Sequence, residues 1–393
     1  MSRRSPGNSV SASPEPGRGR LPEIDLFRGL IMGLMALDHT RGFLMAFEPA
    51  PTDLEATTPA LFATRWITHL CAPGFLLLAG VSAFLGGQRM TRARLAAFLA
   101  SRGAILIALE LTIITFAWIP DPSRSIVLLQ VIWAIGASMI LMAGLVWLPR
   151  AILGAIGLGL MAAHPQLAAA AAALGLPEAL VVILFTGGDG LTGPFGETLL
   201  VSYAVLPWTG AMAAGYALGP LFLGDPDARR SRLALLGGAA IGLGCLLRLA
   251  GLGDPVPWEP GHPRPVLAFL DVEKYPPSPV YLAWTLGLGL WILVVFMRIQ
   301  DRLGRVAAAL LALGRAPLFF YVLHLYALRI VGLGLAALVW GPANLGPPPA
   351  PSTPAWPLWS VYAVWAVAMA VLLGPTARFA RVKARRGGVL RYF

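Results

Sequence analysis

Apolar stretches of about 20 residues, the length an α-helix needs to cross a bilayer, follow one another along nearly the whole chain. We identify ten of them, at residues 26–47, 62–87, 97–118, 126–147, 150–172, 198–223, 232–251, 279–298, 316–340 and 357–375. A membrane β-barrel would instead show short segments of alternating hydrophobicity. The sequence therefore predicts an all-α, polytopic integral membrane protein with about ten transmembrane helices.

The composition agrees, with 57% hydrophobic and 12% charged residues and a mean hydropathy of +0.72. Residues 1–20 are rich in Ser, Pro, Gly and Arg, so we expect a disordered basic tail. They lack the apolar stretch of a cleaved signal, so we expect the first helix to be retained. After this tail we expect a membrane domain over residues 21–376 and a basic C-terminal tail over residues 377–393. The two cysteines, Cys71 and Cys245, lie in apolar segments and suggest neither a disulfide framework nor a metal site.

The arginines gather at both termini and in alternate loops, whereas the intervening loops are acidic or neutral. Positive charge marks the cytoplasmic loops of membrane proteins. With ten spans, all basic segments fall on one side, so we expect both termini in the cytoplasm. The net charge of +11 thus reflects the orientation of the protein in the membrane and its contact with membrane lipids. This pattern argues against a nucleic-acid partner.

The first apolar segment carries three ionisable residues, Asp25, Arg28 and His39. Each such side chain costs about 2.5–3.5 kcal/mol at the centre of a membrane helix and usually faces a bundle interior or a wet cavity. On a helix, Arg28 and His39 fall within roughly 20° of each other and are separated by about 16 Å along the axis. We therefore expect a polar stripe that reaches from one membrane face to near the other.

A second polar group is expected in the outer half of the membrane. The second segment runs antiparallel to the first and begins with Arg65 and His69, which share one helix face. His39 and His69 thus lie at similar depth, with Asp38 and Arg41 nearby. Further polar residues lie in the outer loop before the eighth segment (Lys274 and Tyr275) and in the ninth segment (His324).

Structural interpretations stay open for several of these residues. Arg28 and Arg315 can extend to lipid headgroups, and Arg65 can anchor a helix at the interface. Glu110, buried by position, is open to a structural ion pair with an arginine of another helix. Burial favours a neutral His39, the form that a general base needs; the alternative is a histidine hydrogen-bonded across helices.

The pattern Asp25-x-x-Arg28-Gly29-x9-His39 resembles the first-helix signature of the transmembrane acyltransferases. The rest of the chain is similar to bacterial members of the heparan-α-glucosaminide N-acetyltransferase family. The stretches that carry this similarity are residues 35–41, 64–80, 206–210, 273–278 and 313–324. They extend from the first to the ninth segment, and their order matters more than any one of them.

The resemblance implies a membrane-embedded acyltransferase of the bacterial cytoplasmic (inner) membrane. Such an enzyme moves an acetyl group from cytosolic acetyl-CoA to a sugar or glycan acceptor on the other side, without a metal. The residues implied to bind CoA are Arg28, Asp25, Arg102 and Arg315, with the three arginines as the candidates for contact with its phosphates. His39 would deprotonate the acceptor, helped by His69 and Asp38. The residues implied to contact the acceptor are Arg41, Arg65, Trp66, Lys274, Tyr275 and His324.

One departure concerns the catalytic histidine. The lysosomal branch of that family places it in the first non-cytosolic loop, but this chain has no histidine between His39 and His69. Either His39 or His69 takes the role, or the activity differs. The sequence leaves open the acceptor, the acyl chain length, a direct or acyl-histidine route and a homodimer. The rival interpretations are a secondary transporter or flippase with an intramembrane His/Arg/Asp proton relay, and a non-catalytic membrane protein.

Overall fold

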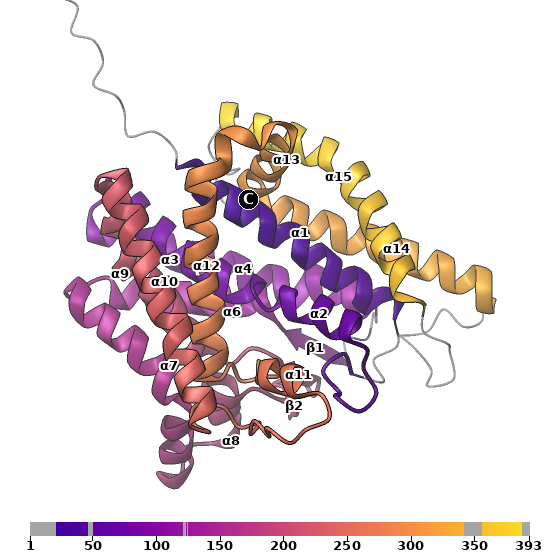
Figure 1. The fold of residues 1–393 in the computed structure, drawn as a ribbon, viewed down its shortest axis with the longest axis horizontal. Helices are drawn as coiled ribbons and strands as arrows, with labels where there is room; N and C mark the ends of the chain where they lie inside the picture. Colours follow the sequence, from indigo (N-terminus) through magenta and orange to yellow (C-terminus); the bar gives the residue numbers. More distant parts are fainter. Residues whose placement is uncertain (1–20, 46–49, 121–122, 124, 342–355, 387–393) are drawn as a thin grey trace, which may run out of the picture.

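The computed structural model describes residues 21–45, 50–120, 123, 125–341 and 356–386, and α1 (Pro22–Leu44) lies at the centre of this part of the chain (Figure 1). The helices that pack against α1 are α2 (Pro59–Thr68), α3 (Cys71–Gly87), α12 (Pro279–Ile299), α13 (Gly304–Arg315), α14 (Pro317–Trp340) and α15 (Leu358–Arg386). Its apolar side chains Leu26, Phe27 and Ile31 are buried. Packing on several sides therefore carries the charged residues of α1 into the interior.

The remaining long helices pack in pairs beside this centre. α4 (Arg92–Leu109) lies against α6 (Val131–Leu145), and α7 (Arg150–Ala173) lies against α9 (Val205–Leu218). α10 (Pro226–Leu249) packs along α12. The short elements are η1 (Glu110–Ile114), α5 (Thr115–Trp118), α8 (Glu178–Val181), η2 (Val182–Thr186), η3 (Gly219–Leu223), α11 (Pro265–Leu270) and η4 (Gln300–Arg302).

Seven helices of the described residues are long and apolar enough to cross a membrane. They are Pro59–Gly87, Arg92–Trp118, Arg150–Ala173, Pro226–Leu249, Pro279–Arg302, Pro317–Val339 and Leu358–Arg386. The predicted all-α membrane fold is thus confirmed, whereas the count of ten stays a prediction. The other three predicted spans contain α1, which is rich in charged residues, and α6 and α9, which have only 15 and 14 residues.

Two of the predicted spans begin as strands, so the expectation of helix from their first residue is wrong. β1 (Ile126–Leu129) pairs in parallel with β3 (Thr198–Val201), and β2 (Gly188–Thr192) pairs antiparallel with β3. A short apolar run of aliphatic residues has no period that separates strand from buried helix. Figure 1 shows β1, β2, α8 and α11 together at one end of the long helices, with α13 at the opposite end.

Glu110 joins two of these elements. It begins η1, and its carboxylate accepts hydrogen bonds from the backbone N–H groups of Gln130 (3.3 Å) and Trp133 (3.1 Å) at the start of α6. The first N–H groups of a helix have no partner within it, and a carboxylate there is favoured by the helix dipole. Within the described residues, Glu110 therefore serves as a helix cap and not as the partner of an arginine.

The predicted N-terminal tail, residues 1–20, lies outside the described residues, as do residues 387–393. α15 continues to Arg386, beyond the predicted end of the membrane domain at residue 376. Residues 377–386 are helical and contain Lys383, which contacts α13. The Nζ of Lys383 donates a 3.0 Å hydrogen bond to the carbonyl oxygen of Arg315. The basic C-terminal segment therefore takes part in the helix bundle.

Candidate active site

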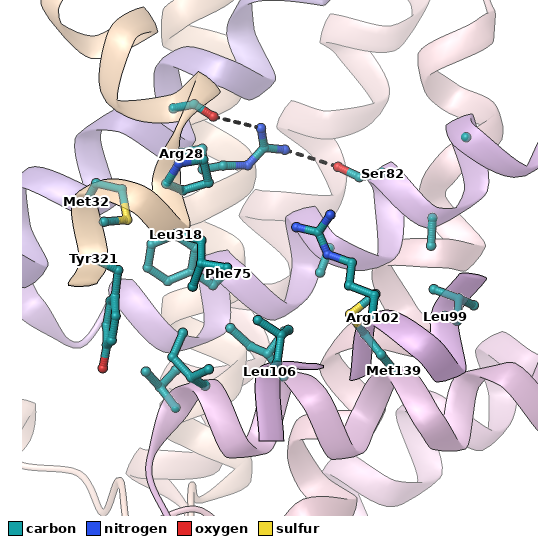
Figure 2. A pocket seen from close by; sticks show the side chains of 18 of the residues that line it. Arg28, Met32, Phe75, Ser82, Leu99, Arg102, Leu106, Met139, Leu318 and Tyr321 are labelled. Carbon is teal, nitrogen blue, oxygen red and sulfur yellow. Dashed lines mark hydrogen bonds between the residues drawn. The ribbon is translucent and has the colours of Figure 1, made fainter. Parts of the chain in front are cut away.

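The first cavity, which we call the Arg28 cavity, lies among α1, α3, α4, α6, α13, α14 and α15 and has a volume of about 370 Å³ (Figure 2). Its cationic lining residues are Arg28, Arg102, Arg315 and Lys383. The rest of the lining includes apolar side chains such as Phe75, Leu99, Leu106 and Leu318. No described lining residue is acidic. The cavity therefore suits a ligand with one anionic end and one apolar or neutral end.

Arg28 is held in place on three sides. Its Nη1 donates to Asp25 Oδ1 (2.9 Å) and to the carbonyl oxygen of Gly314 (3.1 Å), and its Nη2 donates to Ser82 Oγ (3.1 Å). The other carboxylate oxygen of Asp25 lies 3.5 Å from Arg315 Nε. Asp25 is not among the cavity-lining residues. It therefore orients two arginines from behind instead of facing a ligand, which differs from its predicted role.

Arg102 projects from α4 into the same cavity. Figure 2 shows its guanidinium directed toward the end at which Arg28 and Ser82 lie. Lys383, by contrast, was not predicted as a site residue. The basic composition of the C-terminal segment was visible in the sequence, but its return to α13 along a continuous helix was not.

The second cavity, which we call the His39 cavity, has a volume of about 750 Å³. Its polar lining includes Asp38, His39 and Arg41 of α1, and Lys274 and Tyr275 of the loop before α12. Further lining comes from Thr68 at the end of α2, Cys71 and Ala72 at the start of α3, Trp118, β1, and the end of β3 with the residues after it. The pairing of β1 with β3 therefore shapes this cavity, because it places residues of both segments 125–128 and 200–203 at the cavity wall.

His39 is hydrogen-bonded to a second histidine. Its Nδ1 lies 2.8 Å from Nε2 of His324, and Nδ1 of His324 lies 2.7 Å from the carbonyl oxygen of Phe320. A carbonyl only accepts, so His324 carries its proton on Nδ1 when neutral, and its Nε2 accepts from His39. Neutral His39 is then protonated on Nδ1 and has a free lone pair on Nε2. The arrangement thus selects the tautomer of His39 that can take up a proton.

Asp38 pairs with two arginines. Arg65 Nη1 donates to both of its carboxylate oxygens (3.1 and 2.8 Å), and Arg41 Nη2 donates to Oδ1 (3.1 Å). Arg65 comes from α2 and is not among the residues that line the cavity, whereas Arg41 is. Asp38 therefore neutralises and orients cations at the rim of the His39 cavity.

The loop that carries Lys274 and Tyr275 is fixed by a buried arginine. Arg248 of α10 donates to the carbonyl oxygens of Phe269 (3.1 Å), Ala268 (2.7 Å) and Asp271 (2.6 Å) and to that of Val256. Burial raises the pKa of Asp271 to about 6. The backbone N–H groups of Lys274 and Tyr275 both donate to Glu273 Oε1 (2.9 and 2.8 Å).

Tyr275 has an altered acidity. The Nζ of Lys274 lies 4.9 Å from the centre of its ring. Burial alone would raise the pKa of the phenol, but the charges of Lys274 and Arg65 outweigh it and lower this pKa to about 8. Lys274 and Tyr275, two of the residues implied to contact the acceptor, therefore present a cationic and an ionisable group to the cavity.

Besides Asp25 and Arg65, three further predicted residues lie outside both cavity linings. His69 is buried, contacts the ring of Tyr281 edge-on, and has no hydrogen-bond partner for Nδ1 among the described residues. Trp66 donates its indole N–H to the carbonyl oxygen of Leu270 (3.1 Å). His324 is fully buried behind His39. The structure therefore brings His324, and not His69, to His39.

The two cavities share a wall. Met35 of α1 and Val131 at the start of α6 line both of them. Arg28 lies in one cavity and His39 in the other, so the spacing along α1 separates them as the helix periodicity predicts. Sequence reasoning missed Met35, Val131 and Ser82, because neither apolar side chains nor an isolated serine carry a chemical signal of their own.

Among the described residues, no group of three His, Cys, Asp or Glu side chains is arranged to hold a metal ion. The arrangement instead provides cations in one cavity and a base with its orienting partner in the next. This geometry is suited to a reaction between an anionic donor and a polar acceptor.

Comparison with protein families gives a match to the family described as heparan-alpha-glucosaminide N-acetyltransferase, catalytic. It spans residues 20–246, more than half of the chain, and includes Arg28, His39 and Arg102. A comparison with curated protein sequences finds no significant match. The family predicted from the motifs is confirmed: this chain is a multi-pass membrane protein that belongs to the heparan-α-glucosaminide N-acetyltransferase family of acyltransferases.

Proposed function

We propose that this protein transfers an acetyl group from cytosolic acetyl-CoA, bound in the Arg28 cavity, to an amine or hydroxyl of a sugar in the His39 cavity. The observation that carries the proposal is the shared wall of Met35 and Val131 between a cationic cavity and a cavity with a general base. The thioester end of the donor and the nucleophile of the acceptor then have to meet only at this wall, while the rest of each molecule stays in its own cavity.

The donor cavity is matched to coenzyme A by charge. Arg28, Arg102, Arg315 and Lys383 present guanidinium and ammonium groups without an acidic neighbour in the described lining. Such groups form short, charge-assisted hydrogen bonds with phosphate. The apolar side chains deeper in the cavity, such as Leu106 and Met139, accommodate the pantetheine arm, which leads the thioester toward the wall.

The acceptor cavity supplies the base. His39 Nε2 removes the proton of the acceptor while Nδ1 remains hydrogen-bonded to His324, so the imidazolium that forms is stabilised through Phe320. His324 therefore has a positioning role in place of the predicted contact with the acceptor. We keep Arg41, Lys274 and Tyr275 as acceptor-binding residues, because they line this cavity. Arg65 acts through Asp38, and Trp66 anchors α11.

The direction of transfer depends on orientation. Met90 of the basic loop before α4 and the basic residues Arg315 and Lys383 line the Arg28 cavity. We therefore place this cavity and both termini in the cytoplasm, and the His39 cavity on the outer side of the bacterial inner membrane. The acceptor is then a cell-envelope or exported glycan. A transporter would also have two cavities, but it does not need a base whose tautomer is selected by a second histidine.

Proteoliposomes test this function. Acetyl-labelled acetyl-CoA is enclosed inside, and glucosamine is added outside as the probe acceptor. We expect labelled N-acetylglucosamine outside with the wild type and with His164→Ala, a buried histidine of α7 that lines neither cavity. His39→Ala should abolish it. Substrate flux without acetyl transfer would replace the proposal with the transporter, and transfer only when both substrates are inside would contradict the direction.

A further inference from the structure

Tyr321 of α14 is a buried phenol at the boundary between the two cavities. Its side chain is 2% exposed and lines the Arg28 cavity together with Met35 and Val131. Its ring also meets the ring of His39 edge-on at a centroid distance of 5.8 Å, and that of His324 at 5.5 Å. Of the described polar residues in the Arg28 cavity, Tyr321 is thus the one in ring contact with His39.

The hydroxyl group of Tyr321 has no hydrogen-bond partner among the described residues. Leaving a buried hydroxyl unpaired costs about 1–3 kcal/mol, so such a group calls for an explanation. Two other phenols in the same helix bundle are paired: Tyr326 donates to the carbonyl oxygen of Ile113 (2.8 Å), and Tyr281 donates to that of His69 (2.9 Å). Of these three phenols, Tyr321 is therefore the one whose hydroxyl group has no acceptor among the described residues.

The direction of this hydroxyl is favourable for the reaction. Figure 2 shows the phenol of Tyr321 with its oxygen pointing away from the end of the cavity at which Arg28 and Ser82 lie. The cations would bind the phosphate end of a donor there, so the acyl end would lie toward Tyr321. The donor proton of Tyr321 is thus available where charge develops on an acyl carbonyl.

We propose that the hydroxyl of Tyr321 donates a hydrogen bond to the thioester carbonyl oxygen of the acyl donor and stabilises the oxyanion of the tetrahedral intermediate. This inference rests on the proposed acetyl transfer. Tyr321 is then a catalytic residue, because it touches the reacting atoms. Donors that are already in place and excluded from water stabilise such an oxyanion at no cost of reorganisation.

The step balances as follows. The acceptor loses its proton to Nε2 of His39, and its lone pair forms a bond to the thioester carbonyl carbon. The electron pair of the C=O double bond moves onto oxygen, which accepts the hydrogen bond from Tyr321. When the double bond re-forms, the C–S bond breaks, and the CoA sulfur leaves with the electron pair and takes the proton from His39. Tyr321 keeps its own proton throughout.

The decisive variant is Tyr321→Phe, with Tyr326→Phe as the matched control on the same helix. We expect Tyr321→Phe to lower kcat on the order of 10²-fold, as removal of one oxyanion donor does. Its KM for acetyl-CoA should change little, because the phosphate contacts are untouched. Tyr326→Phe should keep the wild-type kcat. Calorimetric binding of acetyl-CoA to each variant confirms that a low rate is not a loss of binding.

The outcomes separate this inference from the proposed function. If the wild type transfers acetyl and Tyr321→Phe keeps its kcat, only the role of Tyr321 is overturned. If the wild type transfers no acetyl, both are overturned. Should Tyr321→Phe fail to fold, a fluorotyrosine at this position preserves the shape. Its more acidic phenol should make activity fall at a lower pH than in the wild type, whereas an unchanged pH profile would contradict a proton-donating role.

Discussion

His39 and His324 form a hydrogen-bonded pair in which Nδ1 of the first lies 2.8 Å from Nε2 of the second, with nearly parallel rings. The carbonyl oxygen of Phe320, 2.7 Å from the other nitrogen of His324, sets the direction of both bonds. A backbone carbonyl thus determines, through one imidazole, which nitrogen of the next imidazole keeps its lone pair. The pair resembles the base and orienting group of other acyl-transfer sites in logic, with a neutral partner in place of a carboxylate.

This relationship predicts that His324 acts through His39. His324→Leu should lower kcat on the order of 10²-fold, the lower end of what a positioned general base contributes, without a comparable change in the KM for acetyl-CoA. His324→Gln should lose less, because its side-chain oxygen can still accept from His39 Nδ1. The measurement is the steady-state rate of acetyl transfer by both variants. Equal losses for Leu and Gln would contradict an orienting hydrogen bond.

Arg28 should contribute directly to the binding of acetyl-CoA. Arg28→Ala should weaken acetyl-CoA binding by roughly 10- to 100-fold, the value of one charge-assisted hydrogen bond of about 1.5–3 kcal/mol. Arg230→Ala removes a cation of α10 that pairs with Asp227 and lines neither cavity, so it serves as the matched control. Isothermal titration with acetyl-CoA measures both. An equal loss in the two variants would point to general surface charge instead of a phosphate site.

Tyr275 should titrate near pH 8 in the folded protein. The charge of Lys274 is the foremost of the effects that lower this pKa, so Lys274→Met should move it back toward the ordinary value of about 10. Because the folded-state pKa is the lower one, the unfolded chain binds more protons between about pH 8 and pH 10, and this group adds stability as the pH rises through that window. The contribution is lost as the pH falls through 8.

Absorbance of tyrosinate, followed against pH, checks this prediction. Tyr275→Phe should remove the titration step, which assigns the step to this residue. An unshifted step in Lys274→Met would show that the ammonium group does not control the acidity of Tyr275.

The sequence was informative wherever a charge had to be buried. The stripe of Arg28 and His39 followed from helix periodicity, because both residues stand on one continuous helix. The partner of His39 did not follow, since Arg65 and His69 on α2 and His324 on α14 were equally polar by sequence. Which of these helices approaches α1 at that depth depends on tertiary packing between residues 285 positions apart.

The strands were missed for a related reason. Ile126–Leu129 and Thr198–Val201 are apolar runs that suit a helix and a strand alike, and only their pairing, 72 residues apart in sequence for Ile126 and Thr198, decides between the two. Parallel strands pair non-locally, so nothing next to either run announces its partner. The wall residues Met35 and Val131 were missed because an apolar side chain acquires a role only from what lies on both sides of it.

The close packing of α1 on α13 leads to a prediction about Gly29. A Cβ at this position would collide with the backbone of Leu310, and one at Gly314 would collide with the backbone of Asp25. Helices approach this closely in membranes where small residues face each other. Gly29→Ala should therefore push α13 away from α1, lengthen the bond from Arg28 to the carbonyl oxygen of Gly314, and destabilise the fold by about 1–3 kcal/mol.

Gly159→Ala is the matched control for this substitution. Gly159 lies within α7, and nothing surrounds the position of its Cβ within 4 Å, so alanine should be neutral or slightly stabilising there. Thermal unfolding in detergent measures both variants, and acetyl-CoA binding reports on the position of Arg28. We expect Gly29→Ala to lose thermal stability and donor affinity together. Loss of stability with full affinity would mean that Arg28 keeps its place without the contact to α13.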